Sequence, residues 1–148
     1  LNKKFTGGKA KFGPINYDVM GPLVRFVDGQ GINETDGCEA ASVDLSGAIA
    51  LVDRGNCTYE TKVTFAGEAG ALGVVIIDNV EADEPPEPGN DNMLEDPSLP
   101  AMAITKSDGA AVLAALSHEG RPLSPRDRLR VERLRRSEPL VSFSALPV

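Results

Sequence analysis

Residues 49–77 constrain the fold of this chain more than any other stretch, because they read as a strand, a helix and a second strand. Two short apolar runs, residues 49–52 and 74–77, bracket the stretch, and each is bounded by polar residues or glycine, as buried strands usually are. Between them, residues 61–68 carry apolar side chains at helical spacing, and Gly70 stands where a left-handed residue would end a helix. This order predicts a βαβ unit with two parallel strands.

The polar turn between the first strand and the helix, residues 53–58, carries most of the chemical interest. Gly55 permits a tight reversal of the chain, and Thr58 is a good candidate for the helix N-cap, with Thr61 as a second candidate. Neither of the glycine-rich phosphate-binding patterns, G-x-G-x-x-G and G-x-x-x-x-G-K-[ST], occurs here. The chain therefore has a βαβ scaffold without a nucleotide-binding motif.

Composition excludes several classes of function. The chain has 148 residues, enough for one domain with its own core, and its net charge of −7 argues against nucleic-acid binding. No apolar run is long enough to span a membrane, and no signal peptide is visible, so we interpret the opening LNKKFTGG as that of a mature fragment or an excised piece. There is no Trp and one histidine, His118, which we expect to be a surface residue.

An active site is not evident from the residue types. The nucleophile motif G-x-S-x-G is absent, and a carboxylate pair for glycoside hydrolysis would come without the usual aromatic platforms. Asp53 and Asp78 follow two adjacent parallel strands, which admits a phosphoacceptor or flavodoxin-like domain, but that fold needs a regular βα repeat and this chain has one convincing unit. We therefore favour a non-catalytic binding module over an enzyme.

The βαβ stretch resembles the core motif of the protease-associated (PA) domain family. That motif is an apolar strand, D-R-G-x-C-x-F/Y, K-V, a helix ending in A-G-A, and a Val/Ile strand ending in Asn. The matching residues here are Asp53, Arg54, Gly55, Cys57, Tyr59, Lys62, Val63, Ala69, Gly70, Ala71 and Asn79. D-G-C at 36–38, L-P-A-M at 99–102 and S-D-G at 107–109 resemble further family motifs in the right order. The resemblance covers residues 12–116.

The resemblance implies a β-rich α/β fold: a curved sheet or open β-barrel with a central βαβ unit and flanking helices. It also implies a disulfide between Cys38 and Cys57, and hence an extracellular or secretory-pathway location. The implied function is that of a protein- or peptide-interaction module, an accessory domain of a secreted peptidase or a sorting receptor. Its expected partners are a protein or peptide ligand or neighbouring domains, with no nucleic acid. The alternatives are a calcium-binding extracellular structural domain and, less favoured, a small hydrolase.

We expect ligands to contact the turn at residues 54–57 and the long loop at 78–100, since both should leave the same edge of the sheet. The candidate peptide-binding residues are Arg54, Asn56, Asp78, Asn79, Asp91 and Asn92. Arg54 would offer a planar, bidentate donor, or it would instead form a salt bridge with Asp53 or Asp78 and brace the turn. The 78–100 loop is rich in Asp and Glu, which suits either a calcium site or a solvated surface; no other cofactor is expected.

The rest of the chain is expected to complete one domain with a core at residues 12–116. Residues 1–11 should form a frayed or edge arm, 23–27 and 101–104 strands, and 108–116 a helix capped by Thr105 or Ser107. Residues 141–145 alternate polar and apolar and should close the sheet. Residues 120–138 are ambiguous: S-P-R-D at 124–127 favours a helix start, whereas 129–131 alternates as a strand would. We favour a helical insertion there.

Overall fold

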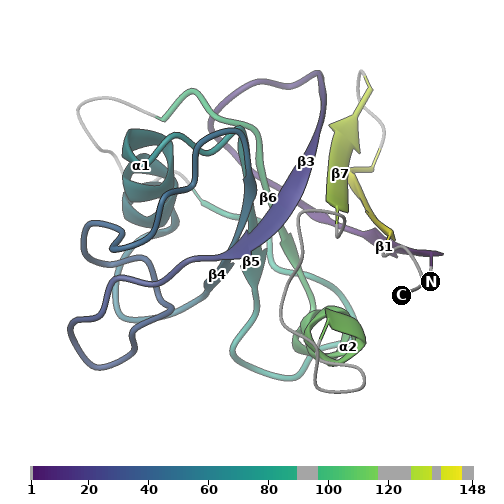
Figure 1. The fold of residues 1–148 in the computed structure, drawn as a ribbon. Helices are drawn as coiled ribbons and strands as arrows, with labels where there is room; N and C mark the ends of the chain where they lie inside the picture. The colour runs from purple at the N-terminus through teal and green to yellow at the C-terminus, as the bar shows by residue number, and fades with distance from the viewer. Residues whose placement is uncertain (1, 90–96, 117–127, 135–137, 145–148) are drawn as a thin grey trace.

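A computed structural model describes residues 2–89, 97–116, 128–134 and 138–144 (Figure 1). The βαβ prediction is confirmed: Ile49–Asp53 and Gly73–Ile77 are parallel strands that flank the helix Tyr59–Glu68. The elements in chain order are β1 (Asn2–Thr6), β2 (Gly8–Lys9), β3 (Tyr17–Arg25), β4 (Ile49–Asp53), α1 (Tyr59–Glu68), β5 (Gly73–Ile77), β6 (Ala101–Ile104), α2 (Lys106–Leu116), β7 (Arg128–Arg133) and β8 (Leu140–Ser144).

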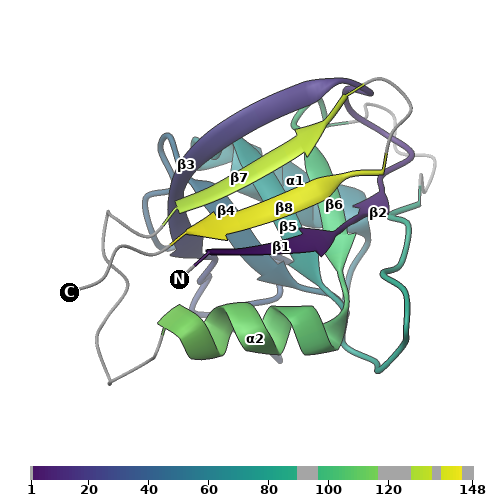
Figure 2. The same ribbon diagram turned by 90° about the vertical axis from the view of Figure 1, so that its right-hand side faces the viewer.

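The strands form one curved, mixed sheet in the order β1-β8-β7-β3-β4-β5-β6-β2. Strands β3, β4, β5 and β6 run parallel to one another. The remaining strands, β7, β8, β1 and β2, pair antiparallel with the strands beside them. The two edge strands are consecutive in the chain, and Figure 2 shows β1 running into β2. The expected edge arm therefore links the two edges of the sheet, because β1 pairs with β8 and β2 pairs with β6. The curved sheet forms an open barrel.

The central strands are buried on both faces, and their side chains alternate between two apolar clusters. Ile49, Leu51 and Val75 face a cluster that includes residues of α2, β7 and β8. Ala50 and Val52 face the other cluster, which α1 covers. The two helices accordingly lie on opposite faces of β4–β6 (Figure 1).

Local signals begin and end the helices as expected. The Thr58 hydroxyl accepts a hydrogen bond from the Thr61 amide at 3.1 Å, so Thr58 is the N-cap of α1, and Gly70 has φ of +97° just beyond its end. Helix α2 begins at Lys106, two residues earlier than expected. The Thr105 hydroxyl accepts from the Asp108 amide at 3.0 Å and caps it. None of the described helices is long and apolar enough to cross a membrane.

Two expectations are corrected by the structure. The favoured helix at 120–138 is wrong where the structure describes it, because Arg128–Arg133 is strand β7, paired with both β3 and β8. Leu129 and Val131 are buried while Arg128 and Arg130 are exposed, which is the two-residue period of a strand. The helix-start signal at 124–127 lies outside the described residues.

Strand β3 also differs from its expected bounds of 23–27, since it spans Tyr17–Arg25. It pairs with β7 over residues 17–22 and with β4 over residues 23–25. Pro22, which has no amide hydrogen, lies at the change of partner. The strand expected at 141–145 is confirmed as β8, and its last predicted residue lies outside the described part of the chain. It does not close the sheet as expected, because it lies between β7 and β1.

Candidate functional site

The carboxyl ends of β4, β5 and β6 lie side by side, as the parallel order requires. Asp53 pairs with Ile77, and Ile77 pairs with Ile104. The ladder continues by one residue, because the Arg54 amide donates to the Ile77 carbonyl at 2.9 Å and the Asp78 amide to the Ile104 carbonyl at 3.0 Å. The turn after β4 and the loop after β5 thus leave the same edge of the sheet.

Arg54 is paired within the chain. Its Nη1 lies 2.9 Å from Asp78 Oδ1, and its guanidinium carbon lies 5.6 Å from the centre of the Tyr59 ring. The Asp78 side chain is only 2% exposed whereas that of Arg54 is 38% exposed, so the pair spans the boundary between interior and solvent. The hydrogen bond to Asp78 raises the pKa of Arg54 above its usual value. Of the two roles open to Arg54, the structure contains the salt bridge to Asp78.

Asp53 has three side-chain donors around it. Arg25 Nη2 lies 2.6 Å and the Thr35 hydroxyl 2.5 Å from its carboxylate oxygens, and Asn33 Nδ2 lies at 3.2 Å. Burial acts to raise the pKa of Asp53, but these hydrogen bonds and the charge of Arg25 outweigh burial, so the pKa is lowered. Asp53 therefore fastens the loop before Cys38 to the end of β4.

A disulfide joins Cys38 to Cys57, as the resemblance implied. Lys62 of α1 is fully buried beside it, and its Nζ donates to the carbonyls of Asp36 and Gly55 at 2.6 Å each. Burial lowers the pKa of Lys62, and nearby carboxylates, Asp36 first, oppose that shift. The sequence analysis used Lys62 only as a motif match and missed this role. No local signal distinguishes a buried lysine on an amphipathic helix from one that reaches solvent.

Asn56 is exposed, but its side-chain amide is paired within the chain. Its φ is +68°, and its Nδ2 donates to Asp36 Oδ2 at 3.0 Å. Asn79 is also exposed, and its side chain lies close to Gly55 at the same edge. Asp91 and Asn92 lie outside the described residues.

The acidic loop after β5 lines two hollows. One, of about 460 Å³, is bounded by Glu81, Ala82, Asp83 and Ser107 at the start of α2. The other, of about 470 Å³, lies between Thr6–Lys9 of the N-terminal segment and Asp83, Glu84, Pro85, Glu87 and Glu138. Asp83 lines both. Lys9 Nζ lies 3.4 Å from a carboxylate oxygen of Glu138. Within the described ranges, the carboxylates at positions 81, 83, 84 and 87 form no salt bridge.

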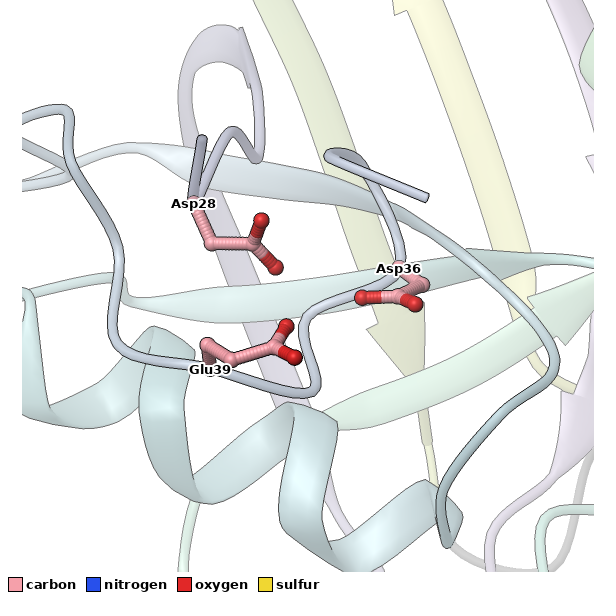
Figure 3. Close-up of side chains that lie close together, drawn as sticks. All are labelled: Asp28, Asp36 and Glu39. Atoms are coloured by element: carbon pink, nitrogen blue, oxygen red, sulfur yellow. The ribbon is translucent and has the colours of Figure 1, made fainter. Parts of the chain in front are cut away.

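A separate group of carboxylates offers the oxygen ligands that a cation would need. Asp28, Asp36 and Glu39 come from the loop between β3 and β4, and one carboxylate oxygen from each lies within 4.8 Å of the others (Figure 3). From the sequence, a calcium site was considered only in the 78–100 loop, as an alternative to a solvated surface, and this group was not considered. Its signal was faint, because the three acids are spaced 8 and 3 residues apart and match no known loop motif.

The described residues offer little for covalent chemistry. Both cysteines are bridged, and His118, the one imidazole of the chain, lies outside the described ranges. At the sheet edge these ranges present carboxylates, the exposed amide of Asn79 and a guanidinium that is paired with Asp78.

Comparison with known proteins identifies the relatives of this chain. The model of the PA domain family matches residues 19–112. A Mycobacterium tuberculosis protein named as a lipoprotein aminopeptidase, LpqL, is 35% identical over 94 residues, which are 62% of this chain and 18% of that protein. Vacuolar-sorting receptor 7 of Arabidopsis thaliana is 32% identical over 122 residues, 74% of this chain and 19% of the receptor. The chain thus spans about a fifth of the length of these relatives.

Solved structures agree on the fold. A zinc aminopeptidase from Bacillus subtilis superposes with a TM-score of 0.56 at 20% identity, over 97% of this chain and 32% of that one. An aminopeptidase from Aneurinibacillus superposes with a TM-score of 0.55 at 22% identity, again over 97% and 32%. At these identities the likeness concerns the fold. The family match covers most of β3, strands β4 to β6, both cysteines and the helix that carries Lys62, and we conclude that this chain belongs to the PA domain family.

Proposed function

We propose that this domain is a non-catalytic accessory module of a secreted peptidase or a sorting receptor, and that it binds basic peptide segments along its acidic loop. The proposal rests on the matched relatives, which are regions of peptidases and of a sorting receptor, and on the charge of the loop. The bridged cysteines fit an oxidising, extracellular compartment.

The observation that carries the binding proposal is the pair of hollows on either side of Asp83. Apart from Glu138, which pairs with Lys9, the carboxylates that line them are exposed and have no cation partner among the described residues. A peptide with Lys or Arg side chains would supply those partners, and complementary charge would speed its encounter and select against acidic peptides. Asn79 stands at the same edge, where its amide can pair with an extended peptide backbone.

Arg54 contributes indirectly in this proposal. Its guanidinium is paired with Asp78, the first residue of the loop, so it holds the loop base in place. Asn56 likewise holds Asp36 in place. In this proposal the ligand contacts therefore come from Asn79 and the loop that follows, and not from Arg54 and Asn56, the two of the six candidate residues that lie in the turn.

Fluorescence polarisation with labelled peptides tests the proposal. A Lys/Arg-containing peptide and its Gln-substituted counterpart are titrated with the native chain, with Asp83→Asn/Glu84→Gln, and with Glu34→Gln/Glu68→Gln. The last variant removes two exposed charges elsewhere, so it matches the net charge of the first. Two exposed contacts of about 0.5 kcal/mol each predict about fivefold weaker binding of the basic peptide by the first variant, and little change in the control. Equal loss in both variants, or a preference for the neutral peptide, would contradict the proposal.

The non-catalytic part is tested on the same chain. Peptidase, esterase and glycosidase substrates should be turned over no faster than in buffer. Activity that co-purifies with the chain and is abolished by His118→Ala or Asp53→Asn would overturn this part of the proposal and leave the peptide-binding part to its own experiment.

A further inference from the structure

The loop between β3 and β4 brings three carboxylates together in the interior. Asp28 and Asp36 are 3% and 1% exposed, and Glu39 is partly buried. Figure 3 shows the three side chains pointing toward a common space. One oxygen of each carboxylate lies within 4.8 Å of the others. Acidic side chains are seldom buried unless something compensates their charge.

Part of that group is compensated by hydrogen bonds. Asp36 accepts from the Cys38 amide at 3.0 Å and from Asn56 Nδ2 at 3.0 Å, one on each oxygen. Asp28 Oδ1 accepts from the Gln30 amide at 2.9 Å. Asp28 Oδ2 is different: it is buried and has no hydrogen-bond partner among the described residues. It belongs to a carboxylate that points toward Asp36 and Glu39 (Figure 3). Glu39 Oε2 is buried and unpartnered in the same way.

The negative charge of the three carboxylates is compensated less well than their hydrogen-bonding capacity. Lys62 is the nearest cation, but its Nζ donates to the carbonyls of Asp36 and Gly55. Three carboxylates and one ammonium leave a formal charge of −2 in this part of the interior. Arg25, the next cation of the described network, is paired with Asp53. Burial, followed by the contact with Asp28 and the charge of Asp36, raises the pKa of Glu39, and the charge of Lys62 opposes that shift.

We propose that Asp28, Asp36 and Glu39 bind one Ca²⁺ ion between β3 and the disulfide. A divalent cation would cancel the residual charge of −2 and give the unpartnered oxygens of Asp28 and Glu39 a ligand role. All three ligands are hard oxygen donors on a loop, which suits the variable geometry and coordination number of Ca²⁺ better than the strict octahedron of Mg²⁺. Water would complete the coordination.

The ion would tie two segments together. Asp28 follows β3, whereas Asp36 and Glu39 flank Cys38, so the ion would link the start of the loop to the segment around the disulfide. Gly31 leaves room for this arrangement, because a Cβ there would lie 2.5 Å from Glu39 Oε1. The inference is independent of the proposed peptide binding, which uses a different loop.

Calorimetric titration of the whole 148-residue chain with CaCl₂, after EDTA treatment and dialysis, tests the proposal directly. We expect one ion per chain and a melting temperature that rises with Ca²⁺ concentration. At one hundred times the dissociation constant the folded-to-unfolded ratio should increase about 100-fold. MgCl₂ should bind more weakly.

Two variants locate the site. Asp28→Asn keeps an oxygen for the Gln30 amide but removes the charge, and should weaken Ca²⁺ binding at least about tenfold, as should Glu39→Gln. Glu34→Gln removes an exposed charge from the same loop and should leave the affinity unchanged. Asp83→Asn/Glu84→Gln should also leave it unchanged, which separates this site from the acidic loop at 78–100.

Two results would overturn the inference. The first is an unchanged melting temperature and no heat of binding on adding Ca²⁺ to the native chain, together with an Asp28→Asn variant that melts higher than the native chain in EDTA. Asp28 and Glu39 would then share a proton instead of an ion. The second is Ca²⁺ binding that survives Asp28→Asn and Glu39→Gln and is lost in Asp83→Asn/Glu84→Gln.

Discussion

Replacing Arg54 by alanine should destabilise the domain, because the guanidinium is the ionic partner of a buried carboxylate. Asp78 is 2% exposed, and without Arg54 it keeps the Val80 amide, at 3.3 Å, as a donor. Breaking a fully buried pair costs about 3–5 kcal/mol. Arg54 is 38% exposed, so screening reduces that figure, and we expect a loss of about 2 kcal/mol in the free energy of unfolding. For a domain of this size the melting temperature should fall by about 4–8 °C.

A double-mutant cycle in urea isolates the pair. Arg54→Ala, Asp78→Asn and the double variant are compared with the native chain, and the coupling energy should be about 1–2 kcal/mol. Arg54→Lys keeps the charge but loses the planar contact with Tyr59, so it should recover about half of the loss. Glu68→Gln, which removes an exposed acid at the far end of α1, serves as the control for charge removal.

Small and additive effects of the two substitutions on the free energy of unfolding would show that Arg54 and Asp78 do not stabilise the domain as a pair. If Arg54→Ala and Asp78→Asn each changed the free energy of unfolding by less than about 0.5 kcal/mol with no coupling, the salt bridge would not brace the turn. Weaker basic-peptide binding by an Arg54→Ala protein of native stability would make Arg54 a ligand contact instead.

Three further predictions concern the same framework. Reducing the disulfide opens a loop of 19 residues, for which chain entropy predicts a loss of about 3 kcal/mol in the free energy of unfolding, measurable by urea denaturation with and without reductant. Burial raises the pKa of Tyr17 from 10.0 to about 12, so the folded chain keeps this proton to a higher pH than the unfolded chain does. The free energy of unfolding should therefore fall by about 3 kcal/mol as the pH rises from 10 to 12. The tyrosinate absorbance of the Tyr59→Phe variant, in which Tyr17 is the one tyrosine left, measures this pKa. Gly109→Ala should destabilise by about 1–2 kcal/mol, because its Cβ would lie 2.2 Å from a β5 side chain, whereas Gly67→Ala, which meets only the end of Leu99 at 3.0 Å, should be neutral or stabilising in thermal melts.

The parts of the fold that follow from local patterns were predictable. The strands around α1, the Thr58 cap and the glycine at the helix end all rest on signals within a few residues of one another. Strand β7 was not predictable in this way. Its two-residue alternation competed with a helix-start signal just before it, and the strand owes its state to pairing with β3 and β8, which lie far away in the chain.

The candidate site was likewise predictable only in part. That the turn after β4 and the loop after β5 share one edge followed from parallel order, and the edge was predicted correctly. The partners at that edge were not. Arg54 meets Asp78 across 24 residues, and Asn56 meets Asp36 across 20, so no local spacing could tell that these side chains are paired within the chain.

The sequence by itself determined the βαβ unit, the family resemblance and its cysteine pair, because periodicity and ordered motifs are properties of neighbouring residues. Only the tertiary structure decided which polar side chains are consumed internally and which remain for a partner. It paired Arg54 and buried Lys62, and it gathered Asp28, Asp36 and Glu39 in one place. The physical reason is that charge compensation depends on distance in space and on burial, and both are set when the loop between β3 and β4 folds back on the sheet.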